Sequence, residues 1–248
     1  MWKSLVSIIA LTAAVSGAAH AGSALVIDTF TPEGEESALP KGWQKAWFGF
    51  CPRHTDYTVV KDDGNWVLKA ESVNAASSIY KEVSIDPRLH QILTWRWKVS
   101  NVLKHGDETR KEGDDYAARL YVLFEYRPVK VSAFEIIERR VIKTVYGKEL
   151  PGEALIYVWA NKLQKNKSVP NPDTDKAMMV AVESGPDKAG VWLLEERNIY
   201  EDYKRLFGKE PPLITHIAIM TDTDNTDEAV TAYYDDIIFH KTMAGAVP

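Results

Sequence analysis

The sequence predicts a mainly β protein, a jelly-roll-like β-sandwich with two short helices packed over it. Two observations lead to this prediction. About eleven segments alternate apolar and polar residues with the period of two that is typical of half-buried strands. Turn residues (glycine, proline, asparagine and aspartate) separate these segments, as in sandwiches and jelly rolls, and the pattern does not resemble alternating strand and helix units.

The predicted strands begin after a leader segment and continue almost to the end of the chain. We expect them at residues 25–30, 57–60, 66–72, 78–85, 92–100, 118–126, 154–161, 177–184, 191–198, 213–221 and 230–240. No internal repeat, low-complexity tract or linker divides them. We therefore expect residues 22–248 to form a single β-sandwich domain.

Two segments carry helical signals instead. Ser132 and Glu135 have the spacing of a capping box, in which the two side chains bond the first free amides of a helix, so a helix is expected from Ser132 to about Tyr146. The second helix is expected at residues 199–207, which place apolar side chains on one face and are followed by Gly208.

Residues 1–21 have the pattern of a secretory signal peptide. Lys3 precedes an apolar run at residues 5–15, and the small-residue triplet Ala19-His20-Ala21 follows. The run is shorter than the roughly 20 apolar residues that span a bilayer. We expect cleavage after Ala21 and a mature protein that is periplasmic or secreted, with no transmembrane segment after removal of the leader.

The charge balance bears on possible partners. The full chain has a formal net charge of −5, and loss of Lys3 with the leader makes the mature chain one unit more negative. Proteins that bind nucleic acid present basic patches. The acidic balance therefore argues against a nucleic-acid partner.

Three residues are expected in the core. Trp95 and Trp97 share one face of a predicted strand, which in a sandwich is more often buried than exposed. Cys51 is the only cysteine, so it has no partner for an internal disulfide, and we expect a small buried residue rather than a nucleophile.

Two predicted strands carry polar and aromatic residues on one face. In residues 118–126 an arginine, a tyrosine and a glutamate oppose an apolar face, and residues 154–161 place a tyrosine and a tryptophan on one face. If these faces adjoin, they form a partly exposed ligand-binding surface, which the polar connections 101–116 and 162–176 could rim. The predicted ligand-binding residues are Asp114, Asp115, Arg119, Tyr121, Glu125, Tyr157 and Trp159.

Three classes of function fit such a surface. Aromatic rings stack on the C–H faces of sugars, so the first is binding of a glycan or cell-envelope polymer without catalysis. The second is a polysaccharide-active hydrolase or lyase that uses carboxylates with Arg119 and Tyr121. The third is a structural envelope protein with a protein partner. The sequence has no nucleophile elbow, zinc-binding HExxH motif or phosphate-binding loop, and Arg119 could simply pair with Asp115 or Glu125.

Several motifs in combination resemble a known family. They are the segments 95-WRW-97, 113-GDDYAARLYVLFEY-126, 155-LIYVW-159, 200-YEDYKRLFGKEPP-212, 217-IAIMTDTDNT-226 and 233-YYDDIIF-239. The chain is similar over nearly its whole mature length to an uncharacterised family of secreted bacterial proteins, domain of unknown function number three thousand and forty-seven. This resemblance implies no established activity. Residues 28–30 and 233–239 are more loosely similar to the first and last strands of carbohydrate-binding jelly rolls, a likeness of fold only.

The acidic segment 220–228 follows a predicted strand. Asp222 and Asp224 have the alternating spacing of calcium loops, and Asp222 shares the parity of Met220, so we expect it to point inward. The segment lacks the glycine and the final glutamate of an EF-hand, which leaves a β-hairpin loop between the last two strands. Aspartate and asparagine also close turns without a metal. The pattern narrowly favours such a polar turn, and a calcium site formed by Asp222 and Asp224 is the alternative.

Overall fold

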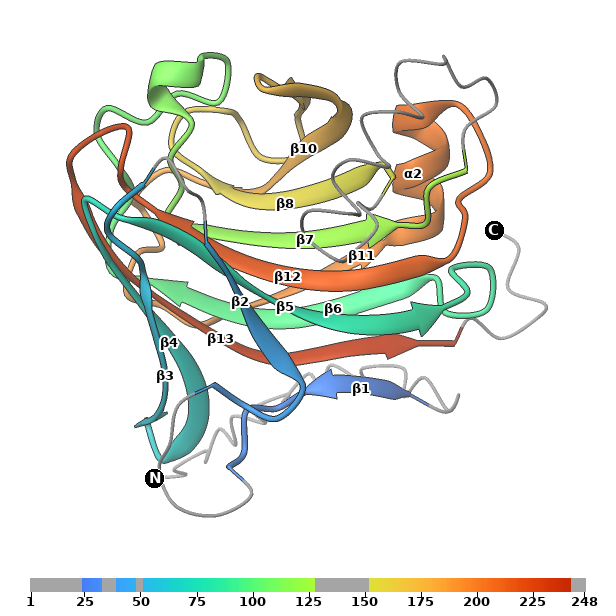
Figure 1. Ribbon diagram of the computed structural model, residues 1–248, viewed down its shortest axis with the longest axis horizontal. Coiled ribbons are helices and arrows are strands. Elements are labelled where there is room, and N and C mark those ends of the chain that lie inside the picture. Colours follow the sequence, from blue (N-terminus) through green and yellow to red (C-terminus); the bar gives the residue numbers. More distant parts are fainter. Residues whose placement is uncertain (1–23, 33–38, 48–50, 128–151, 242–248) are drawn as a thin grey trace, which may run out of the picture.

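The computed structural model describes residues 24–32, 39–47, 51–127 and 152–241 (Figure 1). The strands are β1 (Leu25–Asp28), β2 (Trp43–Trp47), β3 (Asp56–Asp62), β4 (Asn65–Val73), β5 (Ala76–Ile85), β6 (Ile92–Val99), β7 (Ala118–Phe124), β8 (Ala154–Ala160), β9 (Ser168–Asn171), β10 (Thr174–Ser184), β11 (Leu193–Asn198), β12 (Ile214–Asp222) and β13 (Ala229–His240). The helices are η1 (Lys111–Gly113), a turn of 3-10 helix, and α2 (Ile199–Phe207).

The strands form two sheets. Sheet A has the order β11-β6-β13-β4-β3, and β1 pairs with the second half of β13. Sheet B has the order β2-β5-β12-β7-β8-β10-β9. All pairs are antiparallel except β8 and β10, which run parallel. The prediction of a mainly β, jelly-roll-like sandwich is confirmed.

Aromatic side chains fill the space between the sheets. Trp95 and Trp97 of β6 are fully buried, as predicted. The ring of Trp95 lies 5.3 Å from that of Tyr157 on β8, and the ring of Trp97 lies 6.0 Å from that of Trp159. Cys51 is also buried. Large rings from both sheets therefore interlock in the core, where such side chains contribute the most buried apolar area.

The second predicted helix is present as α2. Asn198 caps its first turn by accepting a hydrogen bond from the Glu201 amide at 3.0 Å, and Gly208 ends it in the left-handed region with φ of 68°. Glycine adopts that conformation without steric cost. The helix predicted from Ser132 to about Tyr146 lies outside the described residues, as does the predicted signal peptide. Within the described ranges α2 is the only α-helix, and no helix is long and apolar enough to cross a membrane.

Two strands have no counterpart in the sequence prediction. Both β2 and β9 are short and lie at opposite edges of sheet B. The sequence of β9 contains Pro170, which cannot donate a backbone hydrogen bond and so is tolerated mainly at an edge. Edge strands with one neighbour and partial exposure carry a weak alternation signal, which explains why they were missed.

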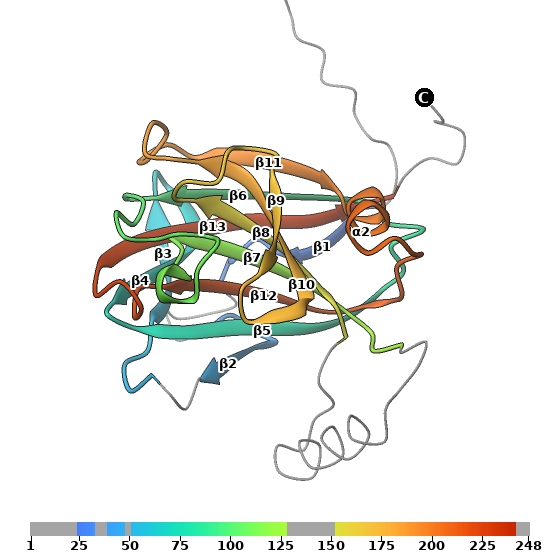
Figure 2. The same cartoon turned by 90° about the horizontal axis from the view of Figure 1, so that it is seen from above.

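The ends of the sandwich differ. In Figures 1 and 2, α2 lies at one end of the strands, and η1 lies at the other end together with the loop that joins β12 to β13. The polar connections thus gather at the end opposite to the helix.

Candidate functional site

A cleft of about 820 Å³ opens on the outer face of sheet B, the face turned away from sheet A. Its volume lies within the range of small-molecule pockets. We call it the outer-face cleft. It is lined by Ala76, Lys111, Asp114, Arg119, Tyr121, Leu123, Gly152, Ala154, Ile156, Asn171, Asp173, Thr174, Lys176, Ala177, Met220, Asp222, Asp224 and Asn225.

The floor of the cleft is formed by side chains that point outward from sheet B. In β7, Leu120 and Val122 point into the core, so Arg119 and Tyr121 point outward. On the neighbouring strand β12, Met220 pairs with Arg119 and faces the same side. The apolar side chains of neighbouring strands and the partly buried Tyr121 ring give this floor a mixed aromatic and aliphatic surface.

One wall of the cleft is formed by a loop that hydrogen bonds hold in place. Glu108 is buried, and its carboxylate accepts hydrogen bonds from the backbone amides of Asn161 at 2.5 Å and Leu163 at 3.1 Å, just after β8. The Asn161 side chain in turn donates to the Asp115 carbonyl at 2.9 Å. These bonds fix the segment that presents Asp114 and Asp115.

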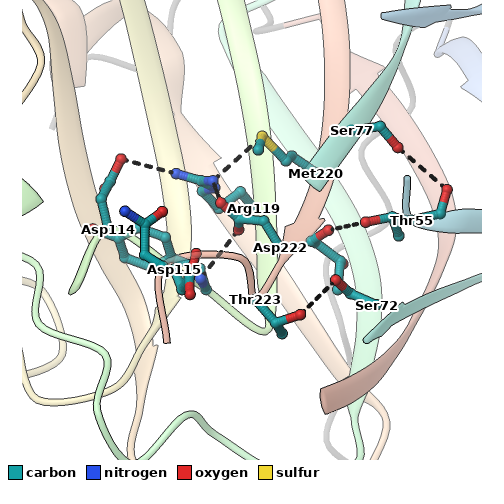
Figure 3. A network of polar contacts seen from close by, with 12 residues as sticks. Thr55, Ser72, Ser77, Asp114, Asp115, Arg119, Met220, Asp222 and Thr223 are labelled. Atoms are coloured by element: carbon teal, nitrogen blue, oxygen red, sulfur yellow. Dashed lines mark hydrogen bonds and ion pairs between the residues drawn. The ribbon is translucent and has the colours of Figure 1, made fainter. Parts of the chain in front are cut away.

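Arg119 is the central charge (Figure 3). Only 2% of this residue is exposed. Its Nη2 forms an ion pair with Asp222 and lies 3.3 Å from the Met220 sulfur, and its Nη1 lies 3.7 Å from Asp114 Oδ2. The guanidinium carbon lies 4.6 Å from the centre of the Tyr116 ring, within cation–π range.

The acidic groups around Arg119 outnumber it. One carboxylate oxygen each from Asp115, Asp222 and Asp224 lie within 4.8 Å of one another, and Asp114 is adjacent. Burial raises the pKa of Asp114 and of Asp222, against the opposing charge of Arg119. Burial also raises the pKa of Asp115, partly offset by the hydrogen bond that the Thr226 amide donates to it. The three clustered carboxylates are the described residues that could hold a metal ion.

Tyr121 is an uncharged hydrogen-bonding group. Burial raises the pKa of its phenol, Arg119 opposes that shift, and the carboxylates of Asp222 and Asp114 add to it. A tyrosine with a raised pKa is a poor base at neutral pH.

Buried hydroxyls support the cluster from behind. The Tyr234 hydroxyl lies 2.8 Å from Thr221 Oγ1 and donates to the Met220 carbonyl at 3.0 Å. In Figure 3 a second chain of hydroxyls continues inward, where Ser72 Oγ lies 2.9 Å from Thr223 Oγ1. Fully bonded polar networks of this kind hold neighbouring side chains in fixed positions.

The structure corrects the predicted surface in two places. Tyr157 and Trp159 pair with Leu120 and Ala118 and point into the core, where both are fully buried. They lie on the opposite face of sheet B from Arg119 and Tyr121, so the prediction of one shared face is wrong. Alternation along each strand defines two faces but does not say which face of one strand adjoins which face of the next, and a one-residue difference in register exchanges them.

Glu125 is also separate from the cleft. It lies just beyond the other end of β7, where its Oε2 accepts a hydrogen bond from Arg127 at 2.7 Å. The structure therefore brings together Asp114, Asp115, Arg119 and Tyr121 of the predicted ligand-binding residues, with Asp222 and Asp224 of the predicted metal pair.

The acidic loop is not a β-hairpin. β12 belongs to sheet B and β13 to sheet A, so the loop after Asp222 crosses the end of the sandwich. Asp222 is buried as expected, beneath the outer-face cleft rather than between the sheets. Asp222 ends β12 just before this crossing and contacts Arg119 and the Tyr116 amide, which explains why its carboxylate is not solvated.

The sequence interpretation missed the wall formed by the β9–β10 turn. Asn171 and Asp173 line the cleft from this turn, and Lys111 Nζ lies 2.9 Å from Asp173 Oδ1 across the mouth. The available signal was the pair of polar connections, 101–116 and 162–176, which supply these residues. Single-residue patterns did not reveal which of their side chains face each other.

A second tyrosine lies on the same outer face. Tyr80 on β5 and Tyr121 on β7 are both paired with Ala218 of the intervening strand β12. Residues directly paired across strands point to the same side. Two strand spacings separate the two tyrosines, about 9–10 Å, and both side chains are partly exposed.

The fold and this cleft define a two-sheet β-sandwich protein with a polar and aromatic cleft on one outer face. The chain belongs to the family described as "Protein of unknown function (DUF3047)", whose model matches residues 41–238. This confirms the family resemblance found in the sequence motifs. No curated protein matches the chain.

Solved structures similar to this chain include two carbohydrate-binding modules. One is a mutant of the family 29 module CBM29-2, with 9% identity, a TM-score of 0.35, and coverage of 88% of this chain and 91% of that one. The other is a module specific for non-crystalline cellulose, CBM28, with 16% identity, a TM-score of 0.37, and coverage of 84% and 96%. Likeness at this level does not identify a ligand or a binding face.

Proposed function

We propose that this protein binds a glycan chain on the outer face of sheet B, with Tyr121 in the outer-face cleft as the principal stacking residue. The single observation that supports this proposal is the combination of an aromatic and aliphatic floor with a polar rim in a cleft of about 820 Å³. Sugars need both kinds of contact, because their C–H faces pack on rings while their hydroxyls require donors and acceptors.

The polar rim fits neutral sugar hydroxyls. Asn171 offers both a donor and an acceptor, Lys176 donates, and Asp114 accepts. The partly exposed ring of Tyr80 would extend the surface beyond the cleft, at a spacing suited to a chain rather than a single sugar. The leader pattern at residues 1–21 supports export of the protein, so we propose that it binds its glycan on the cell-envelope or extracellular side.

The described surface favours glycan binding over docking of a protein. The large exposed apolar side chains are divided between the sheets: Trp47, 65% exposed, is on the edge strand β2 of sheet B, and Leu194, 69% exposed, is on the edge strand β11 of sheet A. A protein interface needs such residues gathered into one patch. We propose binding without catalysis, and product analysis on any bound glycan tests the hydrolase alternative.

The test is a glycan array with the purified protein, followed by calorimetric titration of each hit. Tyr121→Ala should weaken binding by about 1–3 kcal/mol, the usual contribution of an aromatic stacking residue. Circular dichroism and thermal melting establish that the variant is folded.

Tyr233→Ala is the matched control. Tyr233 is a partly exposed tyrosine on β13, in the other sheet, where its ring lies 4.6 Å from Lys98 Nζ. This variant should bind as the wild type does. Loss of binding in Tyr233→Ala with normal binding in Tyr121→Ala would move the site to sheet A and refute the proposal.

A further inference from the structure

We propose that Asp115, Asp222 and Asp224 form a calcium-binding site beneath the outer-face cleft. The inference does not depend on glycan binding. It rests on the position of three carboxylates, on a buried oxygen that lacks a partner, and on the charge of their surroundings.

The three residues come from two separate segments. Asp115 lies just before β7, whereas Asp222 ends β12 and Asp224 follows in the crossing loop. One oxygen from each lies within 4.8 Å of the other two. Oxygens of one calcium shell lie about 2.3–2.6 Å from the ion, so pairs of them are separated by less than about 5.2 Å. The spacing is therefore compatible with a shared ion.

A buried oxygen points to a missing ligand. Asp115 is fully buried, and its Oδ2 accepts a hydrogen bond from the Thr226 amide at 2.6 Å. Its Oδ1 is buried and has no hydrogen-bond partner among the described residues, and the same is true of Thr226 Oγ1. Buried carboxylate oxygens without a partner are costly and rare in native proteins. A bound cation would satisfy Asp115 Oδ1 directly.

Charge favours a cation in the same place. Asp114 and Asp222 pair with Arg119, and Asp115 and Asp224 lie beside Asp222. This one guanidinium leaves three negative charges uncompensated when all four acids are ionised. Asp222 Oδ2 forms the ion pair with Arg119, and Asp222 Oδ1 accepts a hydrogen bond from the Tyr116 amide at 3.2 Å. Each carboxylate oxygen has two lone pairs, which leaves Asp222 able to bind both the arginine and an ion.

The ligand chemistry selects the ion. Carboxylate and hydroxyl oxygens are hard ligands that suit calcium, and no histidine or cysteine belongs to this described cluster. Asp224 is only partly buried, which gives the ion a route from solvent. Sites in extracellular modules have dissociation constants on the order of 10⁻⁴–10⁻³ M, and we expect a value in this range.

The experiment is calorimetric titration of the chelator-treated protein with calcium chloride at pH 7.5, with thermal melting in calcium and in chelator. We expect one saturable site and a higher melting temperature in calcium. Asp224→Asn should weaken calcium binding by about tenfold or more, because it removes one of few carboxylate ligands. Asp115→Asn should do the same. Asp224 is partly exposed, so its variant keeps the test decisive if Asp115→Asn fails to fold.

Asp173→Asn is the control, since Asp173 lines the same cleft outside the cluster. It should bind calcium as the wild type does. No heat of binding and no change in melting temperature up to about 10 mM calcium, well above the expected dissociation constant, would overturn the proposal. Loss of calcium binding in Asp173→Asn but not in Asp224→Asn would also overturn it. Glycan titration of the same variants shows separately whether the proposed function holds.

Discussion

Two groups of arginine and aspartate, each built around a buried ion pair, lie toward opposite ends of the sandwich, and they have opposite proportions of acid and base. Near α2, one carboxylate has several donors: Asp202 accepts from Arg197 at 2.6 and 2.8 Å, from Arg205 at 2.9 Å and from the Tyr157 hydroxyl at 3.0 Å. At the outer-face cleft, one arginine pairs with Asp114 and Asp222, and Asp115 and Asp224 lie close to Asp222. Both oxygens of the Asp202 carboxylate have charged donors, whereas the cleft group has more carboxylates than arginines.

The pKa shifts follow the same division. Burial raises the pKa of Asp202, but hydrogen bonds from Arg197 and Arg205 outweigh burial and hold the pKa below its ordinary value. Its place in the first turn of α2 also suits a negative charge. In the cleft, burial wins and the pKa of Asp222 is raised despite Arg119. Complete pairing is typical of a structural element, and incomplete pairing in a cleft is typical of a ligand site.

The largest expected effect tests Arg119, the buried arginine that pairs with the carboxylates of the cleft. Arg119→Met in chelator should lower the free energy of unfolding by about 3–5 kcal/mol, because it leaves buried carboxylates without their counter-charge. Urea unfolding at pH 7.5 measures it. Arg127→Met is the control, since Arg127 pairs with Glu125 at the surface and such pairs contribute about 0–1 kcal/mol. Equal losses in the two variants would contradict the comparison.

Removing one acid from each group should give a smaller and unequal effect. Asp202→Asn should cost about 2–3 kcal/mol, at or below the lower limit of about 3 kcal/mol for broken buried pairs, because Arg205 reaches solvent. Asp114→Asn in the cleft should cost less than about 1 kcal/mol, since it relieves like-charge repulsion. Both are measured by urea unfolding in chelator. A greater loss in Asp114→Asn than in Asp202→Asn would invert the proposed difference.

The smallest expected effect is a loss of the stabilising contribution of Asp202 at acidic pH. Because the folded-state pKa of Asp202 lies below its ordinary value of 3.8, its carboxylate stabilises the fold fully above that value, and the contribution is lost as the pH falls through the folded-state pKa. The stability difference between the wild type and Asp202→Asn should therefore shrink from pH 5 toward pH 2, a trend set by the linkage relation. Chemical unfolding across this range measures it. A difference that stays constant would show that Asp202 keeps its ordinary pKa in the fold.

Sequence alternation predicted the sheets better than it predicted the site. It identified the burial of Trp95 and Trp97, and it separated Arg119 from Leu120, because both facts depend only on neighbours along one strand. The grouping of Tyr157 with Arg119 required the register between β7 and β8, which is set by contacts far apart in the chain.

The acidic cluster shows the same limit at longer range. Asp222 and Asp224 were visible as a spacing in one loop, but their nearness to Asp115 depends on the pairing of β7 with β12. The wall that carries Asp173 depends on the edge strand β9, which the sequence did not reveal. Predictions from local pattern therefore succeeded within strands and failed where separate segments meet.

The topology also has a consequence for the order in which the chain can assemble. β12 lies between β5 and β7 in sheet B, and β13 lies between β6 and β4 in sheet A. Residues 214–240 thus supply an interior strand of each sheet, although they are the last strands among the described residues. Without them, sheet B is divided into β2-β5 and β7-β8-β10-β9, and sheet A into β11-β6 and β4-β3, so each piece has an edge with unpaired backbone groups. Such exposed edges pair readily with other chains, so truncation before residue 214 should yield aggregating fragments instead of a smaller sandwich.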